Sequence, residues 1–286
     1  MNNKWLKFWH KALNQLRYHP SAFLNRATAN ILLPILPEKS GEIVVNGIRF
    51  HIDAALGHNV KEMRYGYYET ELTELLKKYI RKGDLVIDVG ANIGFISAFM
   101  LGLVGESGDV HSFEPVPEYF ERLKKVKDDN PQFTISVNAM AMGDQEGTSK
   151  ICVSGGDNIG WNTLVPNFMN KKKMKAELEI PVRRLDSYLE DLGLNNVRLI
   201  KIDTEGYEFP VLKGLKGYLE SAPQLPILIV EIAPNAYPKL GLSLEELEQY
   251  MQEFGYACHD IITRRPVNVS TLGNSANVIF RHPKFH

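Results

Sequence analysis

The chain has 286 residues, of which 44% are hydrophobic and 23% charged, so it has the composition of an ordinary globular protein with one large domain plus an extension, or two small domains. Its formal net charge of −1 argues against a nucleic-acid-binding surface over the whole molecule, and no nucleic-acid partner is expected. Two cysteines are too few for a disulfide framework and fit a reducing cytoplasm, and no apolar run reaches the roughly 18 residues of a transmembrane helix.

Residues 1–26 are predicted to form an amphipathic helix. Apolar residues, beginning with Trp5, Phe8 and Trp9, recur every three or four positions, while lysines take the opposite side. One interpretation is peripheral contact with an anionic membrane, which would place the protein in the cytoplasm at the inner face. The more common role of such a helix is packing on the domain or on a second subunit. The sequence does not determine the oligomeric state.

A β-hairpin is predicted over residues 42–52, where alternating apolar residues flank Asn46-Gly47. It is expected to cover one side of the main sheet or of a ligand pocket. Residues 69–81 are predicted to form an amphipathic helix that ends before the first strand of the sheet. We therefore divide the chain into an N-terminal helical and hairpin extension, residues 1–65, and a main domain, residues 66–286.

From residue 85 onward, strands and helices alternate, which predicts an α/β fold with a doubly wound, mostly parallel, seven-stranded sheet. The interval 144–183 interrupts this alternation with a hairpin and a glycine-rich loop, and a connection of that length is usually functional or disordered. The predicted strands are 85–89, 109–113, 133–138, 197–202, 226–231, 256–262 and 276–280. The predicted helices are 93–103, 116–129, 207–220 and 243–254.

The turn after the first of these strands has the spacing Gly90-x-x-x-Gly94. It lacks the Gly-Lys-Ser/Thr ending of a P-loop, and Asn92 stands where a dinucleotide-binding turn has its middle glycine. Asp88 at the strand end would repel a diphosphate and attract a sulfonium or ammonium group. Glu114, twenty residues beyond Gly94, is placed to bind a ribose. These features favour S-adenosyl-L-methionine over NAD.

Five motifs resemble those of the FkbM family of S-adenosylmethionine-dependent methyltransferases, and they occur in the family's order between residues 66 and 234. They are DVGANIG at 88–94, FEP at 113–115, AMGD at 141–144, RLD at 184–186 and LIKIDTEGYE at 199–208. The resemblance implies a class I, Rossmann-like methyltransferase domain with S-adenosyl-L-methionine as cofactor.

The resemblance also implies roles for individual residues. Tyr68 and Glu69 would close over the methionine end of the cofactor, although an acid at a helix N-terminus also has a purely structural explanation. The remaining cofactor residues are Asp88, Gly90, Ala91, Asn92 and Gly94 in the turn, Glu114 and Pro115 at the ribose, and Ala141 and Asp144 near the adenine.

Transfer of a methyl group to a hydroxyl calls for a base, because a hydroxyl has a high pKa. Asp203, Glu205 and Glu231 follow or end predicted middle strands, where open α/β sheets bind their ligands. Lys201 shares the side of its strand with Asp203, so it is predicted either to pair with an acid or to contact the acceptor. Glu205 has a structural alternative as an acid in the first turn of a helix. No metal spacing is present, and no metal is predicted.

The predicted reaction is O-methylation of a small-molecule or glycan hydroxyl. The resemblance suggests a saccharide, a glycolipid or a secondary metabolite as the acceptor. Trp161-Asn162-Thr163, after the glycine-rich loop, could form an aromatic platform for a sugar or could simply pack that loop. Two other functions stay open, namely an NAD-type oxidoreductase and a non-catalytic, membrane-associated protein that binds the cofactor.

Overall fold

The computed structural model describes residues 24, 28–56, 58–155, 161–169 and 174–282. The helix predicted over residues 1–26 falls almost wholly outside these ranges and stays a prediction. Among the described residues, no helix combines the length and apolar character needed to cross a bilayer.

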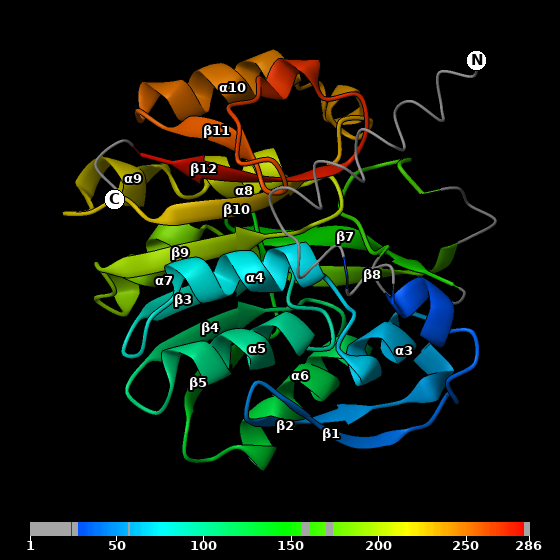
Figure 1. Cartoon of the computed structure of the whole chain (residues 1–286). Coiled ribbons are helices and arrows are strands. Elements are labelled where there is room, and N and C mark those ends of the chain that lie inside the picture. The colour runs from blue at the N-terminus through cyan, green and yellow to red at the C-terminus, as the bar shows by residue number, and fades with distance from the viewer. Residues whose placement is uncertain (1–23, 25–27, 57, 156–160, 170–173, 283–286) are drawn as a thin grey trace.

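The main sheet has seven strands in the order β11-β12-β10-β9-β3-β4-β5 (Figure 1). Neighbouring strands from β10 to β5 run parallel, whereas β12 is antiparallel to both β10 and β11. The predicted mostly parallel, seven-stranded α/β sheet is therefore confirmed. The strands are β3 (Leu85–Val89), β4 (Asp109–Phe113), β5 (Thr134–Asn138), β9 (Val197–Ile202), β10 (Ile227–Ile232), β11 (Ala257–Asp260) and β12 (Ala276–Arg281).

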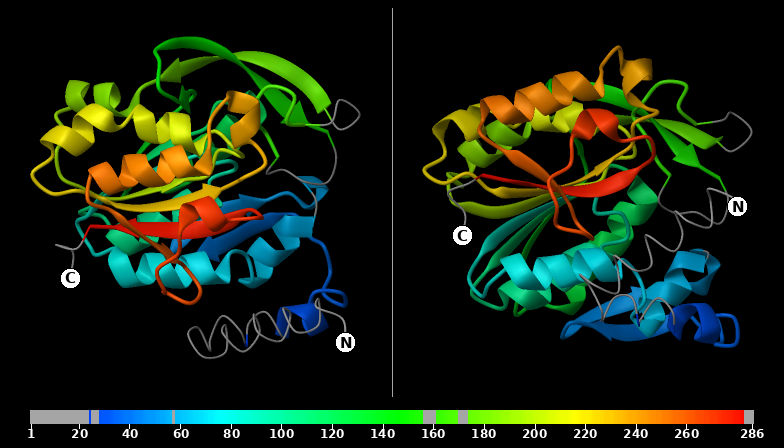
Figure 2. Two further views of the ribbon diagram at one scale, coloured as in Figure 1. Left: turned by 90° about the horizontal axis from the view of Figure 1, so that it is seen from above. Right: turned by 45° about the horizontal axis from the view of Figure 1, so that its top comes forward.

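Helices cover both faces of this sheet, as a doubly wound fold requires (Figure 2). Successive strand side chains point to opposite faces, so Val86 of β3 joins one apolar core and Ile87 joins the other. The first core is completed by α4 (Thr70–Tyr79), α5 (Phe95–Val104) and α6 (Pro117–Asp129). The second is completed by α7 (Leu185–Asp191), α8 (Glu208–Lys213), α9 (Lys216–Ser221) and α10 (Leu244–Glu253).

The predicted hairpin is formed by β1 (Gly41–Val45) and β2 (Ile48–Ile52). Both turn residues have positive φ, 49° at Asn46 and 88° at Gly47, as a tight two-residue hairpin turn requires. The Asn46 amide donates to the carbonyl oxygen of Phe99 on α5 at 3.1 Å. The hairpin thereby packs into the first core, and the division of the chain at residue 65 stays a prediction. A helix that the sequence did not predict, α3 (His58–Tyr65), follows it.

The interval between β5 and β9 contains a second, three-stranded sheet in the order β6-β8-β7. The predicted hairpin here is confirmed, because β7 (Gly147–Ser154) and β8 (Met174–Arg183) pair antiparallel, and β6 (Ala141–Met142) joins β8. The helix predicted over 207–220 is split into α8 and α9 at Gly214. A Cβ at Gly214 would lie 1.9 Å from the carbonyl oxygen of Gly143, so only glycine fits where this break approaches the end of β6.

Candidate active site

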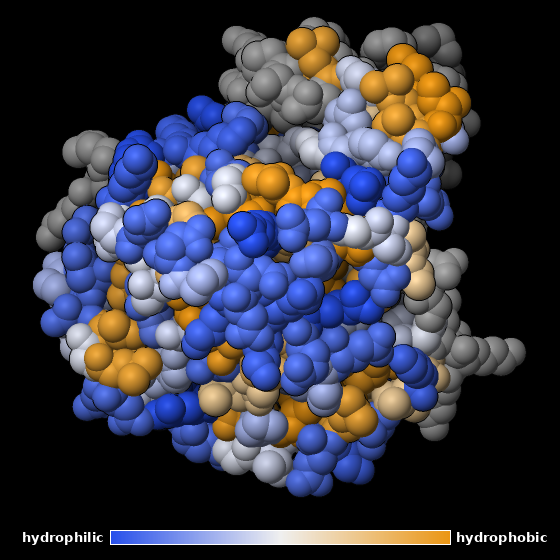
Figure 3. Space-filling model, turned by 90° about the horizontal axis from the view of Figure 1, so that it is seen from below, coloured by the Kyte–Doolittle hydropathy of each residue, from blue (hydrophilic) through white to orange (hydrophobic). Residues whose placement is uncertain are grey.

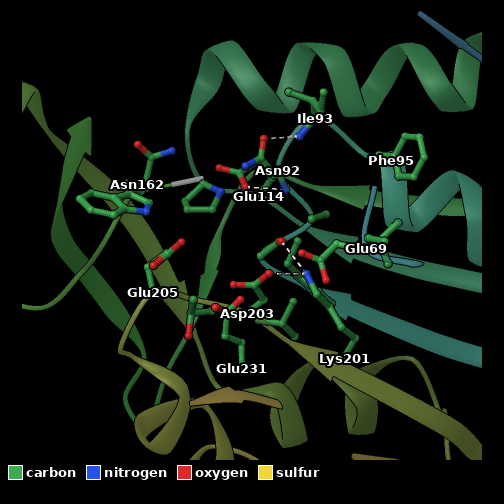
Figure 4. A pocket seen from close by; sticks show the side chains of 18 of the residues that line it. Glu69, Asn92, Ile93, Phe95, Glu114, Asn162, Lys201, Asp203, Glu205 and Glu231 are labelled. Carbon is green, nitrogen blue, oxygen red and sulfur yellow. Dashed lines mark hydrogen bonds and ion pairs between the residues drawn. The ribbon is translucent and has the colours of Figure 1, made fainter. Parts of the chain in front are cut away.

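A cavity of about 270 Å³ lies at the carboxyl ends of β3, β4, β9 and β10 (Figure 4). Open α/β sheets bind their ligands at this edge. The sequence predicted many of the residues that line the cavity, and the structure brings these together from six separate stretches of the chain. They are Tyr68, Glu69, Gly90, Ala91, Asn92, Glu114, Pro115, Ala141, Lys201, Asp203, Glu205 and Glu231.

The turn after β3 lies directly against the loop after β9. Gly90 has a φ of +76°, and a Cβ placed on it would lie 1.8 Å from the carbonyl oxygen of Asp203. The amide groups of Gly90 and Ala91 both donate to the carbonyl oxygen of Phe113, at 3.1 and 2.9 Å. Only glycine allows this approach, so the turn and the acidic loop form one wall of the cavity.

Glu114 supports the same turn from the end of β4. One carboxylate oxygen accepts a hydrogen bond from the Asn92 amide at 2.9 Å, and the other accepts one from the Val116 amide at 2.8 Å. Burial raises the pKa of Glu114 to about 7, although the two backbone hydrogen bonds oppose this shift. Each carboxylate oxygen keeps a further acceptor site, which suits the ribose hydroxyls of a nucleoside.

Lys201 joins three groups behind this wall. Its ammonium nitrogen lies 3.3 Å from Asp88 Oδ1, 3.3 Å from Asp203 Oδ2 and 3.2 Å from the carbonyl oxygen of Gly90. Burial alone would lower the pKa of Lys201, but the charges of Asp203 and Asp88 outweigh it and raise the pKa above its usual value. The lysine is therefore charged. An ammonium group has three hydrogens to donate, and these three oxygen atoms can take all of them.

Four acids, which we call the acid cluster, face the cavity beside Lys201: Glu69, Asp203, Glu205 and Glu231 (Figure 4). Burial and the nearby Asp203 raise the pKa of Glu69 to about 7 and that of Glu205 to about 8. For Glu231, the charge of Asp203 and then burial raise the pKa to about 10. At neutral pH the cluster therefore retains protons, as like charges in a partly dry site must.

Three residues at the cavity have strained backbones. Six non-glycine residues in the described part of the chain have positive φ, and Glu69 (47°), Asn92 (53°) and Glu205 (52°) all line the cavity. The Thr163 hydroxyl, from the loop between β7 and β8, donates to the carbonyl oxygen of Glu205 at 2.7 Å. Such backbone strain is concentrated at functional sites, where the surrounding structure holds it in place.

Three of the predicted cofactor residues do not line the cavity: Asp88, Gly94 and Asp144. Asp88 is fully buried, and it accepts from the Ser97 hydroxyl at 2.6 Å as well as pairing with Lys201. Our sequence-based expectation that Asp88 faces the ligand is therefore corrected, because its charge is directed to Lys201. Gly94 lies against Leu123 of α6. The acid cluster supplies the negative charge that the sequence assigned to Asp88.

Several lining residues were not among the predicted site residues. Asn59, Glu62 and Met63 come from α3, and Asn277 comes from the antiparallel strand β12. No sequence signal marks these residues, because only the packing of α3 and β12 brings them to the sheet edge. Trp161 and Asn162 also line the cavity. This position is compatible with both roles that the sequence suggested for them, a platform for a sugar and packing of the loop.

The Methyltransferase FkbM domain matches residues 88–258, which include the glycine turn, Lys201 and most of the acid cluster. The chain belongs to the FkbM methyltransferase family. It is 26% identical to the hexuronic acid methyltransferase AglP of Haloferax volcanii, over 74% of this chain and 80% of that protein. It is 27% identical to the 31-O-demethyl-FK506 methyltransferase FkbM of Streptomyces tacrolimicus, over 60% of this chain and 76% of that protein.

Among solved structures, the chain is similar to Aeropyrum pernix fibrillarin with bound S-adenosyl-L-methionine. The TM-score is 0.43 and the identity 14%, over 87% of this chain and 85% of fibrillarin. S-adenosyl-L-methionine is the cofactor of this FkbM methyltransferase. The residues present fit that molecule, because a Cβ is excluded at Gly90, Glu114 can accept from ribose hydroxyls, and the acid cluster complements two cationic groups.

Replacing Lys201 tests the ion pairs behind the cavity. In Lys201→Met, the fully buried Asp88 loses its cation, and we expect the free energy of unfolding to fall by about 3 kcal/mol in urea denaturation. The double variant Lys201→Met/Asp88→Asn also removes the stranded charge and should recover more than half of this loss. Wild-type stability of Lys201→Met would show that these ion pairs do not hold the site together.

Proposed function

We propose that this FkbM methyltransferase transfers the methyl group of S-adenosyl-L-methionine to a hydroxyl of a saccharide, a glycolipid or a secondary metabolite. The observation that carries this proposal is the position of Glu205. It faces the same cavity as the glycine turn, and its raised pKa of about 8 suits a general base near neutral pH. An NAD-type oxidoreductase is disfavoured by the family and by Asn92 in the place of the middle glycine.

The acids take different roles in this mechanism. S-adenosyl-L-methionine supplies a methyl group on a positively charged sulfur, which needs no further activation. Glu205 accepts the proton of the acceptor hydroxyl, and Thr163 holds the backbone of Glu205 at the cavity in its left-handed conformation. Asp203 is oriented by Lys201, and Glu231 keeps its proton. These two residues therefore position the ligands and do not accept the proton of the hydroxyl. The protein thus contributes alignment and a base.

The acceptor class is supported by the relatives and by one side chain at the cavity. The names of the two curated relatives refer to a hexuronic acid and to an O-demethylated compound, which supports an oxygen acceptor. Trp161 lines the cavity and is 47% exposed, so its ring offers a flat apolar surface to a sugar or another cyclic acceptor.

Glutamine at position 205 removes the proposed base and keeps the shape of the side chain. We expect Glu205→Gln to lower kcat by roughly 100-fold or more, measured with radiolabelled cofactor and the acceptor identified from cell extracts. Because the base must be ionised, kcat/KM for the cofactor should rise with pH up to about pH 8 in the wild type, following the raised pKa of Glu205. This rise should be smaller in the variant, in which Glu69 still titrates beside the cofactor.

A matched control is Glu190→Gln, which changes an exposed acid on α7 and should leave kcat unchanged. An unchanged rate in Glu205→Gln would remove Glu205 from the mechanism. Cofactor binding without methylation of any extract component would favour the non-catalytic alternative.

We also propose that the N-terminal region contacts the anionic inner face of the membrane from the cytoplasm. The first 37 residues contain five lysines and arginines and no acid, in a chain whose formal net charge is −1. Leu24, Ile31 and Ile35 follow within this region and are 59%, 72% and 77% exposed. Apolar side chains gather at the upper right of Figure 3. Basic charge next to exposed apolar side chains is typical of peripheral membrane contact.

Co-sedimentation with vesicles containing phosphatidylserine tests this contact. We expect Ile31→Ser/Ile35→Ser to bind several-fold more weakly than the wild type, and residues 27–286 alone to bind more weakly still, because each loses apolar or basic contacts. Leu192→Ser is the matched control, since Leu192 is 52% exposed at the end of α7. Equal sedimentation of all four proteins would end the membrane proposal.

A further inference from the structure

The cavity wall carries an unusual excess of negative charge. Among the lining residues that the structure describes, Lys201 is the basic one, while the acids are Glu62, Glu69, Glu114, Asp203, Glu205 and Glu231. Lys201 is also shared with Asp88 behind the wall. The positive charge on the protein side is therefore far too small to balance these carboxylates, and either protons or a cationic ligand must do so.

The acid cluster comes from three separate segments that converge on one space. Glu69 stands at the start of α4, Asp203 and Glu205 follow β9, and Glu231 belongs to β10. The segments that carry these acids are held in place, because the Glu205 carbonyl oxygen accepts from Thr163 and the Asp203 carboxylate pairs with Lys201. Glu69, Glu205 and Glu231 therefore titrate in the field of the neighbouring charges.

Other charged or titratable groups surround the acid cluster. Glu62 on α3 and Glu71 on α4 act on Glu69, Glu208 on α8 acts on Glu205, and Tyr68 lies beside Glu69 and Glu231. The acidic neighbours add to the repulsion within the cluster. Lys201 opposes it for Glu69 and Glu205.

We propose that the acid cluster distinguishes S-adenosyl-L-methionine from its product, S-adenosylhomocysteine, by exchanging protons for the sulfonium charge. Without a cation in the cavity, the cluster holds protons. Binding of the sulfonium cofactor stabilises the ionised carboxylates and releases some of these protons. The product has a neutral thioether, so it releases fewer. This inference rests on the proposed function, in which methyl transfer converts one ligand into the other.

The comparison between these two ligands isolates the sulfonium. Both ligands carry the same amino-acid ammonium, carboxylate, ribose and adenine, so the effects of those groups on the cluster largely cancel. The difference in bound protons then reports the sulfonium charge alone. The raised pKa values of Glu69 and Glu205, about 7 and about 8, place this exchange in the neutral range.

The sign of the pH dependence follows from proton linkage. A ligand that releases protons on binding binds more tightly as the pH rises. The ratio of the Kd of S-adenosylhomocysteine to that of S-adenosyl-L-methionine should therefore increase with pH. A difference of half a proton between the ligands corresponds to about a tenfold change in this ratio between pH 6 and pH 8. The product would be displaced most easily in mildly alkaline solution.

Isothermal titration calorimetry of the full chain measures both quantities without any acceptor. Titrations with each ligand at pH 6, 7 and 8, in two buffers of different ionisation enthalpy, give Kd and the number of protons released. We expect S-adenosyl-L-methionine to release more protons than S-adenosylhomocysteine, and the Kd ratio to rise about tenfold over this range. Sinefungin, which carries an ammonium in place of the sulfonium, should behave like the cofactor.

Two variants assign the effect to the cluster. Glu69→Gln and Glu205→Gln each remove one group whose pKa lies in the neutral range, and each should reduce the difference in proton release, whereas Glu190→Gln should keep it. Equal proton release by the two ligands in the wild type, or a Kd ratio constant within about twofold, would overturn the proposal while leaving methyl transfer intact. Failure of S-adenosyl-L-methionine to bind at all would instead overturn the proposed function.

Discussion

The site depends on one buried lysine. Lys201 contacts three groups: Asp88, its partner on the neighbouring strand β3, Asp203 at the cavity wall, and the carbonyl oxygen of Gly90 in the turn. A charge can stay inside a protein only if it is paired and hydrogen-bonded. Because these partners lie on β3, in the turn after β3 and in the loop after β9, this requirement also holds the cofactor turn and the acidic loop close to each other.

The geometry of the acids follows from that constraint. Gly90 packs against the backbone at Asp203 with no room for a Cβ, and two residues later the loop after β9 places Glu205 in a left-handed conformation. Phe50 of the hairpin packs edge-on against Phe95, with ring centroids 5.6 Å apart, and Phe95 packs in the same way against Tyr68 at 5.3 Å. The N-terminal extension thereby supports the wall that carries Glu69. The acids line one cavity because the start of α4, the loop after β9 and the end of β10 pack next to one another.

The sequence was sufficient for the regular parts of this fold. The strands predicted at 85–89, 109–113 and 197–202 have the predicted bounds, because short β-branched runs between glycines and charged residues permit few other structures. Features that depend on contacts between distant segments were not predictable. The break between α8 and α9 lies where Gly214 approaches Gly143, a residue 71 positions earlier, and α3 reaches the cavity only through its packing.

The same distinction holds within the site. Residue type and spacing correctly placed Glu69, Glu114, Lys201, Asp203, Glu205 and Glu231 at the cavity. They did not reveal that Asp88 points away from it, because the direction of a strand-end side chain depends on a partner 113 residues further along the chain, Lys201. The pKa values of the acids were equally hidden, since they depend on how closely separate segments approach one another.

The contact between Gly90 and the loop at Asp203 can be tested directly by titration with S-adenosyl-L-methionine. Gly90→Ala would place a Cβ 1.8 Å from the carbonyl oxygen of Asp203, whereas Gly273→Ala adds a Cβ with nothing within 4 Å. We expect Gly273→Ala to bind like the wild type, and Gly90→Ala to bind at least about 100-fold more weakly while its circular dichroism stays native. Wild-type affinity in Gly90→Ala, or binding of NADH in place of S-adenosyl-L-methionine by the unaltered chain, would contradict the assignment of this cavity as the cofactor site.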